Sequence, residues 1–256
     1  MLTGASRGIG RALALELARR RCRLALVSRQ REALEEVAAA VRQEGGEVAA
    51  FPADVADPGA MAHAVESAAS FLGELRVVVA NAGVGYHGES LSAPAGEVAR
   101  VVGVNLLGVM NTLSAAAPFL RANGPGAIGV VSSLSGLIPY RGGGVYAATK
   151  AGLNAYLACL RLELAGTGIT VGWVCPGPVD TRMIVDGVPH RKLPPLAKLA
   201  VPIVSPDKVA RTLLRVLERG GGMRVFPWQG AFFVSFYRHF PSLAEKVLRL
   251  TGAGSV

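Results

Sequence analysis

The chain has 256 residues, and its 51% hydrophobic and 18% charged residues argue against an intrinsically disordered protein and provide apolar surface for a sizeable core. Its three cysteines, Cys22, Cys159 and Cys175, are scattered and odd in number, which argues against a disulfide framework or a cysteine metal site. The formal net charge is +9, and residues 1–181 contribute little of it, with 15 Lys+Arg against 14 Asp+Glu.

Short β-like runs alternate with helical patterns along the chain, at residues 23–28, 47–51, 76–80, 127–132 and 169–175. Between them, apolar residues recur at three- and four-residue spacing and predict helices, as at Ile9, Leu13 and Leu17, and again at Leu34, Val37 and Val41. Repeated βα units predict a parallel sheet covered on both faces. Since no linker or internal repeat divides the chain, we expect one α/β domain over residues 1–256, a doubly wound parallel sheet or Rossmann fold, with a helical, aromatic-rich C-terminal extension over about 229–256.

A glycine-rich turn follows the first predicted strand, which is short because only two residues precede Thr3. Gly4, Gly8 and Gly10 give the spacing Gly-x-x-x-Gly-x-Gly and lead into the first helix. Glycines let a pyrophosphate approach the backbone closely, and the helix N-terminus offers N–H groups and the positive end of its dipole. The spacing alone is a weak signal, but its position between a strand and a helix favours a dinucleotide site.

The second predicted strand ends at Ser28-Arg29, where an acidic residue would hold the ribose hydroxyls of NAD. This position carries no carboxylate to repel a 2′-phosphate, and Arg29 and Arg7 could bind one through charge-assisted hydrogen bonds. The sequence therefore favours NADP(H) over NAD(H), although two solvated surface arginines are the alternative interpretation.

An uncharged stretch, Val101 to Leu120, is about as long as a membrane-spanning helix. Polar residues within it, such as Asn105 and Asn111, favour a buried helix that crosses over the sheet.

Tyr146 and Lys150 form the pattern Tyr-x-x-x-Lys, which places both side chains on one face of a helix. A free tyrosine has a pKa near 10, and a nearby ammonium lowers it by favouring the phenolate, which suits proton transfer. Ser133 ends a β-like run thirteen residues earlier, where catalytic groups lie in open α/β sheets. Ser135 remains an alternative substrate contact, and Asp180 and His87 are interpreted as loop residues.

In combination these motifs resemble the short-chain dehydrogenase/reductase family in its compact single-domain form, over roughly residues 1–185. The matching motifs occur in the family's order: Gly4, Gly8 and Gly10; Asp54-Val55; Asn81-Ala82-Gly83; Asn105; Ser133; Tyr146 with Lys150; and Pro176-Gly177 followed by Thr181.

The resemblance implies four catalytic residues. Tyr146 would transfer the proton, and Ser133 would hydrogen-bond the substrate oxygen. Lys150 would hold the nicotinamide ribose and lower the pKa of Tyr146, and Asn105 would interrupt its helix and hold a water that links Lys150 to solvent. No metal site is expected.

The resemblance also implies a cofactor site in which 54–55 contact the adenine, 81–83 wall the cleft and 176–181 border the nicotinamide carboxamide. Its expected residues are Gly4, Ser6, Arg7, Gly8, Ile9, Gly10, Ser28, Arg29, Asp54, Val55, Asn81, Ala82, Gly83, Tyr146, Lys150, Pro176, Gly177, Val179 and Thr181.

The last third of the chain departs from this pattern. Residues 182–256 hold 12 Lys+Arg and 4 Asp+Glu, and residues of about 178–206 occupy the position of the family's variable substrate loop. Further on, aromatic residues recur at helical spacing and predict one apolar stripe: Phe232, Phe233, Phe236, Tyr237 and Phe240. The stripe is expected to pack over the substrate cleft or a partner subunit; the alternative, with Arg238, His239, Lys246 and Arg249 nearby, is a helix on an anionic membrane.

We expect an enzyme that transfers a hydride between NADP(H) and an alcohol or carbonyl substrate, which is apolar, acyl or lipid-like. A homo-oligomer without nucleic acid is expected, in the cytoplasm because no signal peptide opens the chain, with peripheral membrane contact as an alternative. The rival functions are a non-catalytic NADP(H)-binding sensor or scaffold and an epimerase or dehydratase of the same superfamily. The complete Ser133, Tyr146 and Lys150 set argues against the first, and the glycine spacing argues against the second.

Overall fold

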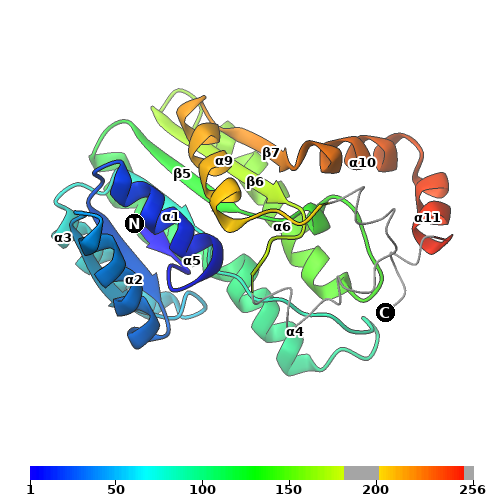
Figure 1. The fold of residues 1–256 in the computed structure, drawn as a ribbon, viewed down its shortest axis with the longest axis horizontal. Coiled ribbons are helices and arrows are strands. Elements are labelled where there is room, and N and C mark those ends of the chain that lie inside the picture. The colour runs from blue at the N-terminus through cyan, green and yellow to red at the C-terminus, as the bar shows by residue number, and fades with distance from the viewer. Residues whose placement is uncertain (182–201, 251–256) are drawn as a thin grey trace.

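The computed structural model describes residues 1–181 and 202–250, which form a seven-stranded parallel sheet in the order β3-β2-β1-β4-β5-β6-β7 (Figure 1). The strands are β1 (Leu2–Thr3), β2 (Leu24–Ser28), β3 (Val48–Pro52), β4 (Val77–Ala80), β5 (Gly126–Val131), β6 (Ile169–Pro176) and β7 (Gly222–Phe226). All neighbouring strands pair in parallel, which confirms the expected doubly wound Rossmann arrangement.

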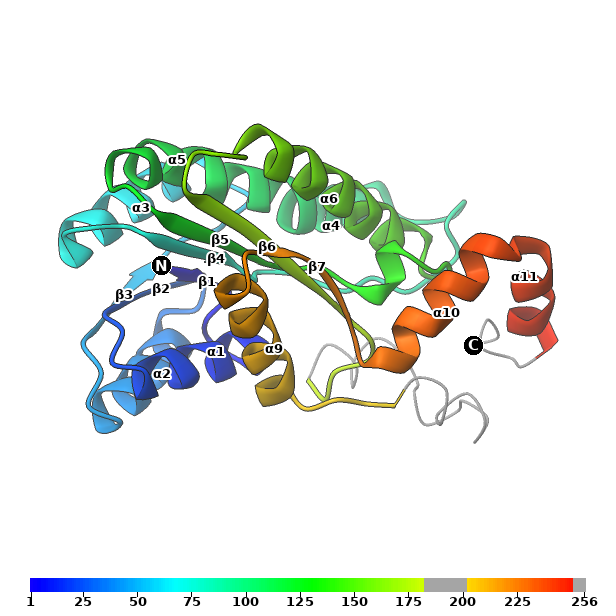
Figure 2. The same ribbon diagram turned by 90° about the horizontal axis from the view of Figure 1, so that it is seen from above.

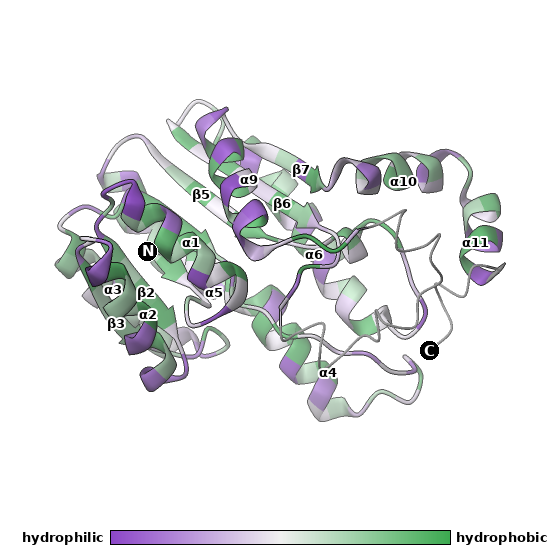
Figure 3. Ribbon diagram, in the orientation of Figure 1, coloured by the Kyte–Doolittle hydropathy of each residue, from purple (hydrophilic) through white to green (hydrophobic). Residues whose placement is uncertain are grey.

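Helices cover both faces of the sheet (Figure 2). One face carries α1 (Gly8–Arg19), α2 (Arg31–Gln43) and α9 (Pro206–Glu218). The other carries α3 (Pro58–Leu72), α4 (Ala95–Val102), the π-turn η1 (Gly103–Leu107), α5 (Gly108–Ala122) and α6 (Gly144–Glu163). Polar residues gather on the outer faces of helices such as α2 and α9, as the purple segments of Figure 3 show.

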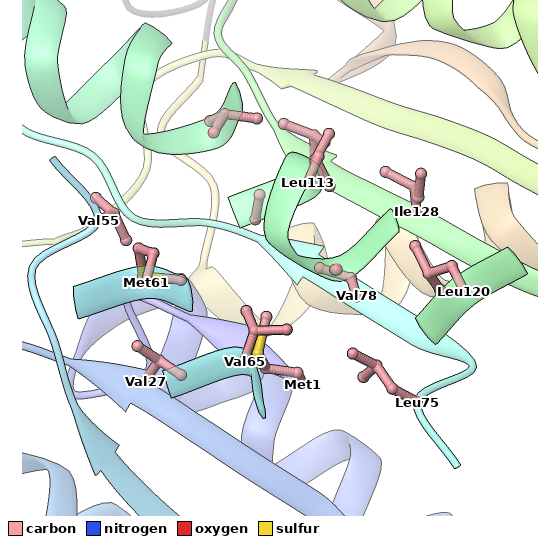
Figure 4. Close-up of a cluster of buried hydrophobic side chains, with 14 of the residues drawn as sticks. Met1, Val27, Val55, Met61, Val65, Leu75, Val78, Leu113, Leu120 and Ile128 are labelled. Atoms are coloured by element: carbon pink, nitrogen blue, oxygen red, sulfur yellow. The ribbon is translucent and has the colours of Figure 1, made fainter. Parts of the chain in front are cut away.

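Two hydrophobic cores separate the helices from the sheet, because successive strand residues point to opposite faces. On β2, Val27 joins the core beneath α3 and α5, where Met61 and Leu120 are fully or almost fully buried (Figure 4). Its neighbour Leu26 joins the opposite core, with Leu13 of α1. Strands buried on both faces are read in the sequence as continuous apolar runs, which is why five of them could be predicted.

The predicted crossover helix lies between β4 and β5, where α5 packs against α3 and the sheet. Among the described residues, Ala95–Ala122 is the helical stretch that is long and apolar enough to cross a membrane. Leu113, Ala116 and Leu120 of this stretch are buried in the core, as expected for a helix that covers the sheet.

Strand β7 was not predicted. Gly220 and Gly221 before the strand and Gly222 at its start all adopt positive φ values, and a Cβ at Gly221 would overlap the carbonyl oxygen of Val171. These glycines break the apolar pattern, and Met223 of the strand itself is exposed. Gly222 and Arg224 thus interrupt the apolar residues of β7, which gives no continuous apolar run.

An arm of two helices, α10 (Trp228–His239) and α11 (Pro241–Leu250), follows β7 and extends beyond the sheet (Figures 1 and 2). The predicted aromatic stripe does not pack as one unit. Gly230 and Val234 form the buried face of α10, whereas Phe232 and Phe240 are 64% and 57% exposed. The predicted substrate loop lies mostly outside the described residues.

Candidate active site

Most of the expected site residues lie at the carboxyl edge of the sheet, because they end or follow a parallel strand. The glycine-rich turn follows β1, Ser28 ends β2, Asn81 follows β4, Ser133 follows β5 and Pro176 ends β6. Segments far apart in the sequence thus form one continuous edge.

The glycine-rich turn is shaped for close approach of a ligand to the backbone. Gly4 and Gly8 have φ values of +64° and +54°, which residues with a side chain rarely adopt. A Cβ at Gly4 would lie 2.7 Å from the backbone nitrogen of Ala82, and one at Gly10 would overlap the carbonyl oxygen of Gly4. Helix α1 starts at Gly8 with no side chain capping it and no acidic residue in its first turn, so its N-terminus suits a pyrophosphate.

Asn81 fixes the position of this turn. Its Nδ2 donates to the carbonyl oxygens of Thr3 and Gly4, at 3.2 and 3.0 Å. The backbone N–H groups of Asn81 and Ala82 donate in return to Thr3 Oγ1, at 3.1 and 3.3 Å. The loop after β4 therefore holds the glycine-rich turn in place.

The residues at the end of β2 fit the adenosine ribose of a dinucleotide. Ser28 Oγ is buried and has no hydrogen-bond partner among the described residues, so it can serve a bound ligand. Arg29 Nη1 lies 3.6 Å from Asp54 Oδ2, and both side chains are partly exposed. The sequence has no carboxylate at the end of β2. In the structure, however, the Asp54 carboxylate, which follows β3, lies next to Arg29. An exposed pair of this kind contributes about 0–1 kcal/mol, so Arg29 can exchange it for a phosphate.

The loop after β6 closes the cleft next to the turn. The backbone N–H of Gly177 donates to the Phe226 carbonyl oxygen at 2.7 Å, and Val179 forms a parallel bridge with Val204. Thr181 reaches the turn, since a Cβ at Gly8 would lie 3.1 Å from Thr181 Cγ2. The carboxamide and pyrophosphate regions expected from the sequence are therefore adjacent.

Ser133, Tyr146 and Lys150 come together at the end of β5. Tyr146 and Lys150 project from α6, and the Lys150 Nζ lies 5.8 Å from the centre of the Tyr146 ring. Ser133 starts the short 3₁₀ helix η2 (Leu134–Gly136) and is hydrogen-bonded to Tyr146. Lys150 is buried and donates to the Val131 carbonyl oxygen at 3.2 Å.

Burial controls the protonation of this group. It raises the pKa of Tyr146 to about 12, and the hydrogen bond to Ser133 opposes only part of that rise. It also lowers the pKa of Lys150 to about 8. The Tyr146 pKa is therefore not lowered as expected, because desolvation of the buried phenol is the largest cause of its shift. Tyr146 is protonated at neutral pH and can donate its proton.

Asn105 lies in the π-turn η1, so the expected interruption of its helix is present. Its Oδ1 accepts from the Val84 backbone nitrogen at 2.8 Å, and its Nδ2 donates to the Val84 oxygen at 2.9 Å and to Thr149 Oγ1 at 3.3 Å. The Asn105 side chain is fully buried. It lies close to Lys150, since a Cβ at Gly83 would be 3.4 Å from Asn105 Oδ1 and 3.8 Å from Lys150 Nζ.

Asn105→Ala is expected to lower the free energy of unfolding by about 1–3 kcal/mol, because the Val84 backbone groups lose their partners in a buried position. Urea denaturation measures this change. Asn123→Ala is the control, since its amide makes a single long bond of 3.4 Å to the Leu75 oxygen. Equal effects of the two substitutions would contradict the bracing role of Asn105.

Two aromatic residues lie beside the site: Tyr140, which the sequence analysis did not single out, and His87, which it interpreted as a loop residue. The rings of His87 and Tyr140 stack with centroids 6.2 Å apart and planes within 9°. Tyr140 is hydrogen-bonded to Ser135 and lies close enough to Tyr146 to raise its pKa further. His87 Nδ1 is buried with no hydrogen-bond partner among the described residues. The glycine run 142–144 was the available signal, because a Cβ at Gly143 would overlap the Tyr140 ring.

Comparison with known proteins agrees with this geometry. The family model described as short chain dehydrogenase matches residues 1–191. A ketoacyl reductase, HetN from Nostoc sp., is 34% identical over 219 residues, which is 85% of this chain and 74% of the relative. In some longer curated relatives the chain corresponds to only 17% or 44% of the length.

Solved structures show the same fold. A 3-ketoacyl-ACP reductase from Sinorhizobium meliloti is 34% identical, with a TM-score of 0.79 over 90% of this chain and 98% of that one. An alcohol dehydrogenase from Thermococcus sibiricus, complexed with 5-hydroxy-NADP, is 30% identical, with a TM-score of 0.77 over 88% of this chain and 94% of that one. Other similar structures hold NADP or NADH. The chain therefore belongs to the short-chain dehydrogenase/reductase family and is an oxidoreductase of the NAD(P)-binding Rossmann type.

Proposed function

We propose that the chain reduces the carbonyl group of an apolar or acyl substrate with NADPH, with Tyr146 as the proton donor. The observation that carries this proposal is the phenol of Tyr146, which is protonated at neutral pH, hydrogen-bonded to Ser133 and placed on the same sheet edge as the glycine-rich turn. A protonated donor favours the direction from carbonyl to alcohol.

The nicotinamide, when bound, supplies the hydride that adds to the carbonyl carbon. Ser133 donates a hydrogen bond to the carbonyl oxygen and stabilises the negative charge that develops there. Tyr146 then transfers its phenolic proton to that oxygen, which completes the alcohol. The nearby Lys150 ammonium stabilises the phenolate left on Tyr146, and bulk solvent restores the proton.

The preference for NADPH rests on Ser28, Arg29 and Arg7. The buried Ser28 hydroxyl can bind the ribose or its 2′-phosphate, and the exposed side chains of Arg29 and Arg7 can bind the phosphate anion. Asp54 beside Arg29 does not remove this preference, because an exposed ion pair at 3.6 Å is weak and Arg29 can exchange it for the phosphate.

The double substitution Arg7→Ala with Arg29→Ala is expected to weaken NADPH binding at least tenfold, since each hydrogen bond to a charged group contributes about 1.5–3 kcal/mol. NADH binding should remain unchanged, because NADH lacks the 2′-phosphate. Isothermal titration calorimetry with both cofactors measures the difference. Arg121→Ala, an exposed arginine in the last turn of α5 near the opposite edge of the sheet, is the control. An equal loss for both cofactors would exclude a phosphate contact.

An acyl substrate is supported by two observations. HetN and the Sinorhizobium meliloti protein are both named as ketoacyl reductases. In this chain, the apolar residues Leu134, Leu137 and Ile138 follow Ser133 closely in the sequence, and the stacked rings of Tyr140 and His87 lie beside the site. The test is turnover of 3-ketoacyl thioesters of increasing chain length with NADPH, and a rate that rises with chain length is expected. Turnover limited to short polar ketones would contradict the acyl assignment.

A further inference from the structure

We propose that the α10–α11 arm docks on an anionic phospholipid surface. The contact is made by an aromatic row, defined as Trp228, Phe232 and Phe236 of α10 together with Phe240, which directly follows the helix. Trp228, Phe232 and Phe240 are 71%, 64% and 57% exposed, and the rings of Phe236 and Phe240 touch, with centroids 5.8 Å apart. Leu243 of α11 adds a further side chain that is 51% exposed.

The aromatic row does not attach the arm to the rest of the protein. Gly230 and Val234 do so on the opposite face, because two residues along a helix turn it by about 200°. A Cβ at Gly230 would lie 3.2 Å from Val225 Cγ1 and 3.4 Å from Leu134 Cδ2, so the backbone of α10 packs closely on β7 and on η2. The outward row is therefore available for a contact outside this chain.

Several large aromatic side chains gathered on one exposed face are uncommon on a soluble monomer and mark an interaction surface. Tryptophan and phenylalanine on one helix face, with cations nearby, are typical of helices that lie in a membrane interface.

The charge of the arm favours an anionic bilayer over a second copy of this chain as the partner of the aromatic row. Arg238, Lys246 and Arg249 are exposed, and Glu245 is the arm's one acidic residue. A two-fold contact between copies uses the same patch on both subunits and would bring these cations together. An anionic bilayer neutralises them instead.

The arm also connects the lipid surface to the site. Leu134, against which α10 packs, follows Ser133 directly, and β7 delivers the arm at the carboxyl edge of the sheet where the site lies. A docked arm therefore holds this edge near the bilayer, so that an acyl substrate dissolved in the membrane can reach Ser133. This step rests on the proposed function, whereas the docking itself does not.

Trp228 provides a direct signal, because the other tryptophan, Trp173, is buried in β6. The full chain is titrated with vesicles of phosphatidylcholine alone and of phosphatidylcholine with phosphatidylglycerol. We expect a blue shift of the Trp228 emission and co-flotation with the anionic vesicles, both weakened by salt. No binding to anionic vesicles at low salt would overturn the proposal.

Phe232→Ser with Phe240→Ser should reduce vesicle affinity at least about tenfold, whereas the control Leu162→Ser, which changes a leucine of α6 that is 75% exposed, should not. Turnover of a short, water-soluble 3-ketoacyl thioester with NADPH, assayed without vesicles, should be the same in all three proteins. If the wild-type protein shows no such turnover, the proposed function is refuted, whereas the docking proposal is unaffected. Sedimentation measures the oligomeric state. If the wild type forms a dimer that the double substitution breaks, and it does not bind vesicles, the aromatic row contacts a second copy of the chain and the docking proposal is refuted.

Discussion

Tyr146→Phe is expected to reduce kcat for carbonyl reduction by about 10²–10⁴-fold, the range contributed by a positioned general acid. The substitution removes the phenolic proton and its hydrogen bond to Ser133 but keeps the ring that fills the space beside Lys150. NADPH affinity should stay within about twofold, because the phosphate contacts lie on other elements. Steady-state kinetics and cofactor titration measure the two quantities separately.

Tyr156→Phe is the matched control, since it makes the same chemical change on the same helix, at a residue that packs against the core. It should retain full turnover. If Tyr146→Phe also retained it, the proton would have to come from another group, and Tyr140 would be the first to examine.

Gly10→Ala is expected to abolish cofactor binding and to destabilise the fold. The added methyl group would overlap the carbonyl oxygen of Gly4, which is backbone and cannot rotate away as a flexible side chain could. Overpacking of this kind costs about 1–3 kcal/mol, and relieving it displaces the turn that holds the pyrophosphate. Thermal unfolding with and without NADPH measures both effects.

Gly96→Ala is the control for this substitution, because a Cβ at Gly96 in α4 meets nothing within 4 Å. Alanine is the better helix former, so the control should leave stability equal or slightly raised. A response to NADPH that survives in Gly10→Ala would contradict a close contact between the turn and the cofactor.

The fold could be predicted from local pattern to a large extent. Residues 24–28 and 169–175 are apolar runs because both faces of a parallel strand are buried, and the helices show their buried side every three or four residues. Strand β7 starts at the third of three successive glycines and contains Arg224, so its pairing with β6 depends on the whole sheet rather than on its own composition.

Site residues could be predicted at positions that require one residue type. Side-chain contacts and pKa values that depend on burial or on distant parts of the chain could not. Gly4 and Gly10 were found because no side chain fits there. The contact of Arg29 with Asp54 joins two strand ends and has no local signal. The pKa of Tyr146 moved in the opposite direction from the sequence expectation because desolvation is a tertiary property.

The C-terminal arm shows the same limit. The spacing of its aromatic residues predicted a helix, which is present, but it could not say which face is covered. Gly230 and Val234 form the inner face because the glycine lets the helix backbone approach Leu134, which is information that only the packed structure contains.

The most direct test of the cofactor site is thermal unfolding of the full chain titrated with NADPH and with NADH. A ligand at about 100 times its dissociation constant adds roughly 2.7 kcal/mol to the free energy of unfolding, so binding is visible without a known substrate. We predict that NADPH raises Tm at much lower concentrations than NADH. Equal responses would contradict the 2′-phosphate contact of Arg7 and Arg29, and no response to either cofactor would contradict the nicotinamide site itself.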